Sequence, residues 1–229
     1  MAICITSDAS QKYISFLQRK GVNISEYNGN ENSTGIVVYQ SVSGRQVGKY
    51  ASDILKKIVN MGGEPPYFIV LGLQWSKTGD KHSITLVIDG EQGHCSIHIF
   101  DSNGPLKLHK SPNNKNQIDR LYLILVSLRE QLSEYYNCSA EIIDDMKDIE
   151  NLNTVGQGNC DALSLWYITK YFLHPEDKKI LKKFEAEMYP KNMTPKQASS
   201  NREKIINKIN QDVVKLGGRS PNTKGTFFN

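Results

Sequence analysis

Cysteine is scarce in this chain, and no two cysteines are closely spaced. The four cysteines are Cys4, Cys95, Cys138 and Cys160, and no Cys-x-x-Cys pair occurs. This spacing argues against both a zinc site and a disulfide framework. We therefore expect no metal and no cofactor. We also expect reduced thiols in a cytosol-like compartment, where a reactive thiolate can function.

Long apolar runs and a strong net charge are also missing. No run reaches the roughly 18 apolar residues of a membrane span, and the opening residues MAICITSDASQKY lack the basic and apolar regions of a secretory signal. The net charge of +4 is too mild to require nucleic acid. We expect a globular monomer with no membrane span and no nucleic-acid partner.

The patterns that are present alternate between helix and strand. Helical periodicity and capping signals occur over residues 7–21, 47–63, 116–136, 160–172, 175–188 and 194–217. Runs rich in β-branched and aromatic residues predict strands at 36–42, 65–75 and 138–144, with a hairpin over 82–101. The mixture predicts an α+β fold.

One face of the predicted hairpin ends in an imidazole and a carboxylate. If Ile88 pairs with Cys95, the same register places His82 directly opposite Asp101. Directly opposed residues have Cβ atoms about 4.5–5.5 Å apart, and a slip of two residues would leave the pair diagonal on the same face. We therefore predict that His82 acts as a general base and that Asp101 orients it.

Cys160 lies between a glycine-rich segment and an amphipathic helix, in TVGQGNCDALSLWYITKYF. It is either a small core residue, because cysteine is among the most buried residue types, or a nucleophile whose thiolate is favoured by the helix N-terminus. Nearby Gln157 offers an amide N–H for an oxyanion. The hairpin pair and this glutamine favour the nucleophile.

The remaining histidines have weaker signals. His94 and His98 fall on the outer face of their strand, where we expect them to be solvated. Two imidazoles without a third ligand nearby make a poor metal site.

With His82, Asp101, Gln157 and Cys160 in that order, the sequence resembles the clan of Ulp/adenain-like cysteine proteases. That clan contains ubiquitin-like-protein proteases, bacterial effector deubiquitinases and YopJ-type acetyltransferases. The resemblance covers about residues 47–172. It implies a papain-like, Ulp-type cysteine protease fold, with a central mixed β-sheet flanked by helices. It also assigns the base, the orienter, the oxyanion donor and the nucleophile to those four residues respectively.

The chain departs from that pattern at three places. Most members have the glutamine about six residues before the cysteine, where this chain has Thr154. Most read Asp-Cys-Gly, whereas this chain reads Asn159-Cys160-Asp161. SUMO proteases have tryptophan after the histidine, and this chain has Ser83.

The resemblance implies a cysteine isopeptidase that removes ubiquitin or a ubiquitin-like modifier. A pathogen effector with a role in virulence, acting in the cytoplasm or secreted into a host cytosol, fits the distribution of the clan. Trp75, Gly158 and Asn159 are the expected substrate-binding residues. The expected parts are an N-terminal accessory region (1–46), a catalytic core (47–173) and a C-terminal helical extension (174–229).

Two alternatives remain open. The segment CDALSLWYITKY is similar to the Cys-x-x-x-Ser-Leu pattern of YopJ-like acetyltransferases, which use the same triad with acetyl-CoA. A non-catalytic binding module with a vestigial triad is the other alternative.

Overall fold

The computed structural model describes residues 7–29, 35–37, 44–75, 80–91, 93–105, 120–149, 152, 159–177 and 179–217. The strands are β1 (Asn23–Tyr27), β2 (Ile36–Val37), β3 (Tyr67–Trp75), β4 (Asp80–Glu91), β5 (His94–Phe100) and β6 (Ser139–Asp144). The helices are α1 (Ser7–Arg19), α2 (Gly44–Met61), α3 (Arg120–Tyr136), α4 (Cys160–Leu173), α5 (Ile180–Met188) and α6 (Pro195–Gly217).

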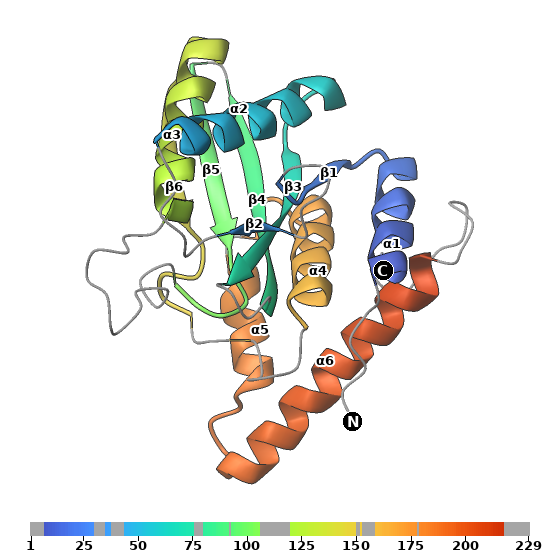
Figure 1. The fold of residues 1–229 in the computed structure, drawn as a ribbon. Coiled ribbons are helices and arrows are strands. Elements are labelled where there is room, and N and C mark those ends of the chain that lie inside the picture. The colour runs from blue at the N-terminus through green and yellow to red at the C-terminus, as the bar shows by residue number, and fades with distance from the viewer. Residues whose placement is uncertain are drawn as a thin grey trace.

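All of these strands form one mixed sheet in the order β1-β3-β4-β5-β6, and β2 also pairs with β3 (Figure 1). β4 runs antiparallel to both of its neighbours, whereas β1 and β2 run parallel to β3, and β6 runs parallel to β5. The predicted α+β fold class, with a central mixed sheet flanked by helices, is confirmed.

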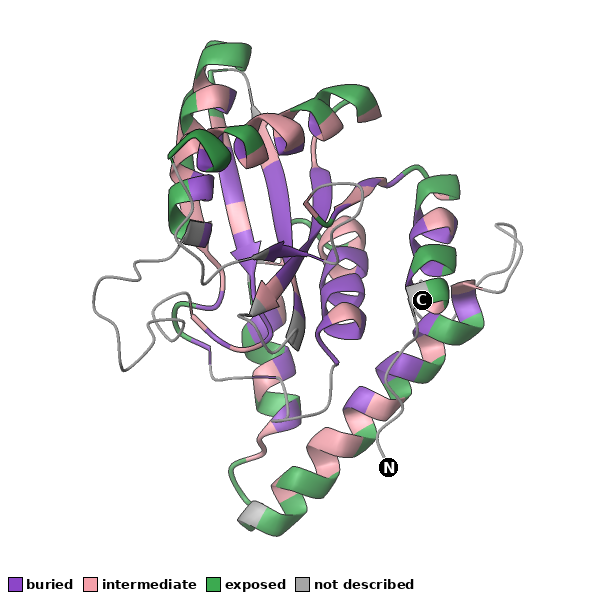
Figure 2. Cartoon of the chain, viewed as in Figure 1, coloured by how far each residue is buried: buried purple, intermediate pink, exposed green. Residues whose placement is uncertain are grey.

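Helices cover both faces of the sheet, so its central strands are buried (Figure 2). α2 and α3 share one hydrophobic cluster with the side chains of one face, such as Leu71 and Leu86. α1, α4, α5 and α6 share a second cluster with the side chains of the other face, such as Phe68 and Val87. β3 accordingly reads as an almost continuous apolar run, as expected for a strand covered on both sides.

α4 is the most deeply buried helix of the second cluster. Residues on every side of it are buried, including Leu163, Trp166 and Ile168. A helix that is apolar on all sides belongs in the interior of a protein. The sheet and the neighbouring helices therefore fix the position of its first residue, Cys160.

The two ends of the described chain meet beside α4. α6 lies along α1 in Figure 1, and a Cβ added at Gly217 would lie 3.0 Å from the backbone nitrogen of Tyr13. The same Tyr13 makes a buried hydrogen bond of 2.9 Å to Thr169 of α4. Residues from all three expected parts (1–46, 47–173 and 174–229) thus share one hydrophobic cluster.

Two local features differ from the expectations. β1 was not predicted, because its sequence NISEY has no clear apolar alternation; its pairing with β3 forms it. Of the strand predicted over 36–42, only 36 and 37 lie among the described residues.

Among the helices described, none has the length and apolar character needed to cross a bilayer.

Candidate active site

His82 lies near the start of β4, where it pairs with Leu73 of β3. Its side chain points to the face that carries Ile84 and Leu86, as the alternation predicted, and it is only 3% exposed. The ladder with β3 holds the backbone of this residue, which lies three residues before the first pair of β4 with β5.

The predicted register of the hairpin is wrong by two residues. Ile88 pairs with Ile97 and not with Cys95, because the two strands continue pairing up to Glu91 and His94. Gly93, with φ of 84°, helps to form the tight turn between them. The predicted pairing of Ile88 with Cys95 left residues 89–94 as the connection, whereas the strands pair up to Glu91 and His94.

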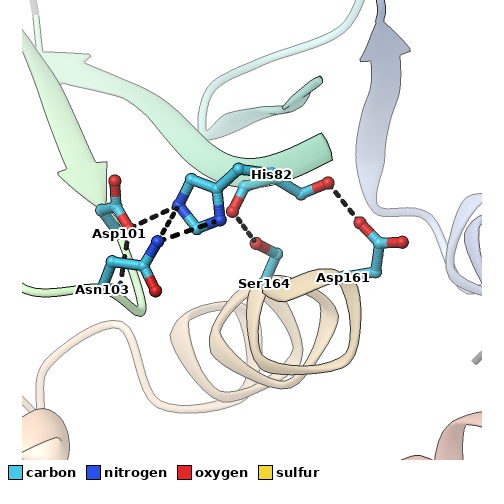
Figure 3. A network of polar contacts seen from close by, with 6 residues as sticks. His82, Asp101, Asn103, Asp161 and Ser164 are labelled. Atoms are coloured by element: carbon cyan, nitrogen blue, oxygen red, sulfur yellow. Dashed lines mark hydrogen bonds and ion pairs between the residues drawn. The ribbon is translucent and has the colours of Figure 1, made fainter. Parts of the chain in front are cut away.

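Asp101 nevertheless reaches His82 from the diagonal position. Its Oδ1 lies 2.7 Å from Nε2 of His82, and its side chain is almost completely buried (Figure 3). The same Oδ1 accepts a hydrogen bond of 2.8 Å from the backbone N–H of Asn103, and the N–H of Gly104 donates to the Asp101 carbonyl. A tight turn directly after β5 therefore fixes the carboxylate.

Asn103 is a site residue that the sequence analysis missed. Its amide nitrogen lies 3.3 Å from both ring nitrogens of His82, so the amide packs against the imidazole (Figure 3). The observed register explains its position, because continuing that register past β5 brings residue 103 opposite residue 82. A correct register would have indicated this residue.

Cys160 is the first residue of α4, and its sulfur is close enough to His82 to raise the pKa of that imidazole. The cysteine is buried, with 6% of its surface exposed. The structure thus brings together three of the predicted residues: the thiol, the imidazole and the Asp101 carboxylate. The imidazole lies between the other two groups.

The electrostatics of the site favour a charged imidazole. Burial by itself would lower the pKa of His82, but the nearby Asp101 carboxylate and the Cys160 sulfur outweigh burial and raise that pKa to about 10. An imidazolium beside a sulfur stabilises a thiolate, which is the reactive form of cysteine. The raised pKa of His82 therefore places a charged imidazole next to Cys160 at neutral pH.

Ser83 and Asp161, two departures from the family pattern, contact each other. The Ser83 hydroxyl donates a short hydrogen bond to Oδ1 of Asp161 (Figure 3). The hydroxyl of Ser164 in turn donates to the Ser83 carbonyl at 3.4 Å. These contacts join β4 to α4 beside His82 and Cys160.

The other predicted site residues have different outcomes. Asn159, expected to bind substrate, is completely buried, and its Oδ1 accepts a hydrogen bond of 3.1 Å from Asn210 of α6. Its side chain therefore faces the protein interior, which corrects the prediction. Gln157 and Gly158 lie outside the described residues. Trp75 ends β3 opposite Asp80, and its side chain is outside the described part.

Of the two histidines of β5, His94 matches the expectation and His98 does not. His94 is exposed as predicted, at 3.2 Å from Glu141. His98 is largely covered, at 3.0 Å from Asp145, because α4 packs on this face of the hairpin. Within the described ranges, no group of three or more potential ligands is placed to hold a metal ion.

Comparison with known proteins finds similar solved structures. No protein-family model and no curated protein matches the chain. The pS273R protease of ASFV is 14% identical, with a TM-score of 0.42 over 87% of this chain and 69% of that chain. The Legionella pneumophila effector protein RavZ is 10% identical, with a TM-score of 0.42 over 85% of this chain and 52% of that chain. A de-sumoylating protease is 13% identical, with a TM-score of 0.40 over 91% and 78% of the two chains.

Proposed function

We propose that this chain is a cysteine isopeptidase that removes ubiquitin or a ubiquitin-like modifier from its targets. One observation carries the proposal. The sulfur of Cys160 is close enough to His82 to raise the pKa of that imidazole, and Nε2 of His82 lies 2.7 Å from the Asp101 carboxylate. Nucleophilic catalysis by cysteine requires this arrangement of thiol, base and orienting group.

The first half of the reaction forms a thioester. The Cys160 thiolate attacks the carbonyl carbon of the isopeptide bond, and the carbonyl oxygen becomes an oxyanion. The imidazolium of His82 then gives its proton to the departing lysine amine as the C–N bond breaks. The modifier is left attached to sulfur through its terminal carbonyl.

The second half of the reaction releases the modifier. Neutral His82 takes a proton from a water molecule that attacks the thioester carbonyl. The C–S bond breaks, the modifier leaves as a carboxylic acid that gives its proton to solvent, and the sulfur returns as a thiolate beside the imidazolium. Asp101 keeps the ring in one orientation throughout, because its Oδ1 accepts a hydrogen bond from Nε2.

The start of α4 supplies part of the oxyanion site. The first N–H groups of a helix have no partner within the helix, and no side chain caps them at Asn159. We propose that they act together with the side-chain amide of Gln157. We further propose that Trp75 and Gly158 line the narrow path by which a glycine-containing tail reaches the sulfur.

The choice of substrate follows from the resemblance of the sequence to the Ulp/adenain-like clan. The order of the histidine, aspartate and cysteine along the chain supports a modifier of the ubiquitin family. The free thiols of Cys95, Cys138 and Cys160 suit a reducing compartment. We therefore propose that the protein acts in a cytosol, and that this is a host cytosol if the chain comes from a pathogen.

The acetyltransferase alternative depended on the Cys-x-x-x-Ser-Leu pattern. In the structure, Ser164 is fully buried and donates its hydroxyl to the Ser83 carbonyl, and Leu165 belongs to the hydrophobic cluster. Both residues therefore have a structural reason to be present. The pattern does not require acetyl-CoA.

Probes made of ubiquitin or SUMO with an electrophile at the C-terminus test the proposal. We expect at least one probe to label the wild-type protein and the Cys95→Ser/Cys138→Ser variant. Cys160→Ala should lose all labelling, and His82→Ala should lose it while keeping the wild-type circular dichroism spectrum. Mass spectrometry of the adduct should place it on Cys160.

Two results would overturn the proposal. Absence of labelling, together with transfer of acetyl groups from acetyl-CoA that depends on Cys160, would identify a transferase. Absence of both activities would identify a non-catalytic module.

A further inference from the structure

The residues on either side of Cys160 each make a polar contact to a different element. Asp161 accepts the hydrogen bond from Ser83 of β4. Asn159 accepts the hydrogen bond from Asn210 of α6. A nucleophile that must meet a base within a few tenths of an ångström needs such support, because misplacement of about 1 Å costs about 100-fold in rate.

The contact between Ser83 and Asp161 joins the strand of the base to the helix of the nucleophile. Ser83 is the residue after His82, and Asp161 is the residue after Cys160. The bond therefore lies one residue away from each reacting group. A shift of Ser83 relative to Asp161 therefore changes the distance between the Cys160 sulfur and the His82 imidazole.

Two weaker hydrogen bonds continue this contact along the helix. Ser164 donates to the Ser83 carbonyl at 3.4 Å, and Thr85 donates to the Ser164 carbonyl at 3.5 Å (Figure 3 shows the first). Together with the Asp161 bond they fix both the rotation of α4 about its axis and its position along β4. The side chains involved are buried or half-buried, so water competes with them only weakly.

The charge of Asp161 gives no direct help to the nucleophile. A carboxylate in the first turn is stabilised by the helix dipole, but its negative charge beside the sulfur opposes formation of the thiolate. The advantage of this residue must therefore come from its oxygen as a hydrogen-bond acceptor. Asp161 therefore has a positioning role and not an electrostatic one.

The contact between Asn159 and Asn210 supports the other side of the cysteine. Both side chains are completely buried, and the amide of Asn210 lies 3.1 Å from Oδ1 of Asn159. Asn159 precedes the helix but does not cap it with its side chain. Its side chain instead links the start of α4 to the middle of α6, and this gives the C-terminal helix a part in the site.

We propose that Ser83, Asp161 and Asn210 are positioning residues that set the distance between the Cys160 sulfur and the His82 imidazole. The inference rests on the proposed function. The first two residues hold the helix to the strand of the base. Asn210 makes α6 a necessary part of the catalytic unit.

The test measures the reactivity of Cys160 without any protein substrate. Cys4, Cys95 and Cys138 are replaced by serine, which leaves Cys160 as the one thiol in the chain. The rate of alkylation by iodoacetamide is then followed against pH. A thiolate held by an imidazolium reacts fast at neutral pH, whereas an unsupported thiol reacts only as it ionises near pH of about 8.5.

We expect Ser83→Ala and Asp161→Ala each to slow alkylation at neutral pH by about tenfold or more and to lower kcat by about 10- to 100-fold, with little change in KM. The double variant should react as fast as Asp161→Ala alone, because both substitutions remove the same hydrogen bond. Asp161→Asn keeps an acceptor oxygen, and it should recover most of the lost rate. Ser96→Ala is the matched control: it removes a buried serine hydroxyl that donates to the Asp89 carbonyl at the far end of the hairpin.

The Asn210 contact is tested with Asn210→Asp, which removes the donor and keeps the size of the side chain. We expect slower alkylation and a lower kcat. Asn201→Asp is its control, because Asn201 lies in the same helix but donates to the Glu187 carbonyl of α5. It should leave both rates close to those of the parent.

Several results would overturn the inference. One is a lower melting temperature with unchanged alkylation and kcat in the Ser83, Asp161 and Asn210 variants, which would make these contacts purely structural. Another is recovery of the lost rate by Asp161→Glu and not by Asp161→Asn, which would show that the charge of Asp161 is what matters. Failure of the proposed function is a separate result: wild-type Cys160 would still alkylate rapidly at neutral pH, yet no ubiquitin-family probe would label it.

Discussion

Among single residues, His82 and Asp101 form a buried pair whose charge state controls the site. Burial disfavours a charged imidazole, and the carboxylate at 2.7 Å together with the sulfur reverses that preference, so the pKa of His82 rises to about 10. A folded-state pKa above the unfolded value of about 6.5 means that the pair stabilises the fold most below about pH 6.5. That stabilisation is lost as the pH rises through about 10.

Replacement of Asp101 by asparagine should therefore shift the pH dependence of the protein. Without the carboxylate, the pKa of His82 falls, and the imidazolium is lost at a lower pH. We expect the alkaline limb of the profile of kcat/KM, and of Cys160 alkylation, to move to lower pH than in the wild type. An unchanged alkaline limb would show that Asp101 does not control the imidazole.

Among elements, the second face of the hairpin is held to its neighbours by a half-buried polar network. His98 of β5 lies 3.0 Å from Oδ1 of Asp145, which follows β6, and the hydroxyl of Tyr167 in α4 donates to the other oxygen of that carboxylate. Burial lowers the pKa of His98, and Asp145 outweighs that effect and raises it, with smaller contributions from Asp89 and Glu141. The network thus joins three elements through one carboxylate.

Replacement of His98 by alanine should lower the free energy of unfolding by about 1–3 kcal/mol in mildly acidic solution, because a charged hydrogen bond is lost. The raised pKa places this contribution below the unfolded pKa of histidine, and it fades as the pH rises past the folded value. Urea denaturation at several pH values measures the difference. His94→Ala is the control: His94 and Glu141 are more than half exposed, so the loss should be small at every pH.

For the whole molecule, the packing of the first and last described helices decides how α4 is held. α1 and α6 contact each other and α4, and together they form one cluster with side chains of the sheet. Gly217 lies where α6 meets the backbone of α1. The N-terminal and C-terminal parts, expected to be accessory, therefore support the helix that begins with Cys160.

Gly217→Val should lower the free energy of unfolding by about 1–3 kcal/mol, because its side chain would be forced against the α1 backbone. A Cβ at this position would lie 3.2 Å from the Lys12 carbonyl carbon and 3.0 Å from the Tyr13 nitrogen. Gly48→Ala in α2 is the control, because a Cβ there meets nothing within 4 Å. It should stabilise the helix by about 0.5–1 kcal/mol. Thermal and urea unfolding measure both changes.

Much of the candidate site could be predicted because local patterns determine it. Alternation along 82–88 and 95–101 placed His82 and Asp101 on one face in both the predicted and the observed register, since a slip of two residues keeps the face. The periodicity after Cys160 predicted an amphipathic helix that begins at the thiol, and the structure has a helix there that is buried on nearly all sides. Periodicity within ten or twenty residues is sufficient for such statements.

The remaining features depend on segments that are far apart in the sequence. The sequence by itself determined that His82 and Asp101 lie on one face at the end of the hairpin and that Cys160 starts a helix, because side-chain direction follows the backbone period. The tertiary structure decided the hairpin register, the pairing of β1 with β3, the covering of His98 by α4, and the bonds of Ser83 to Asp161 and of Asn159 to Asn210. Those contacts arise only when whole helices and strands pack together, and no local pattern encodes the partner that a polar side chain meets across the core.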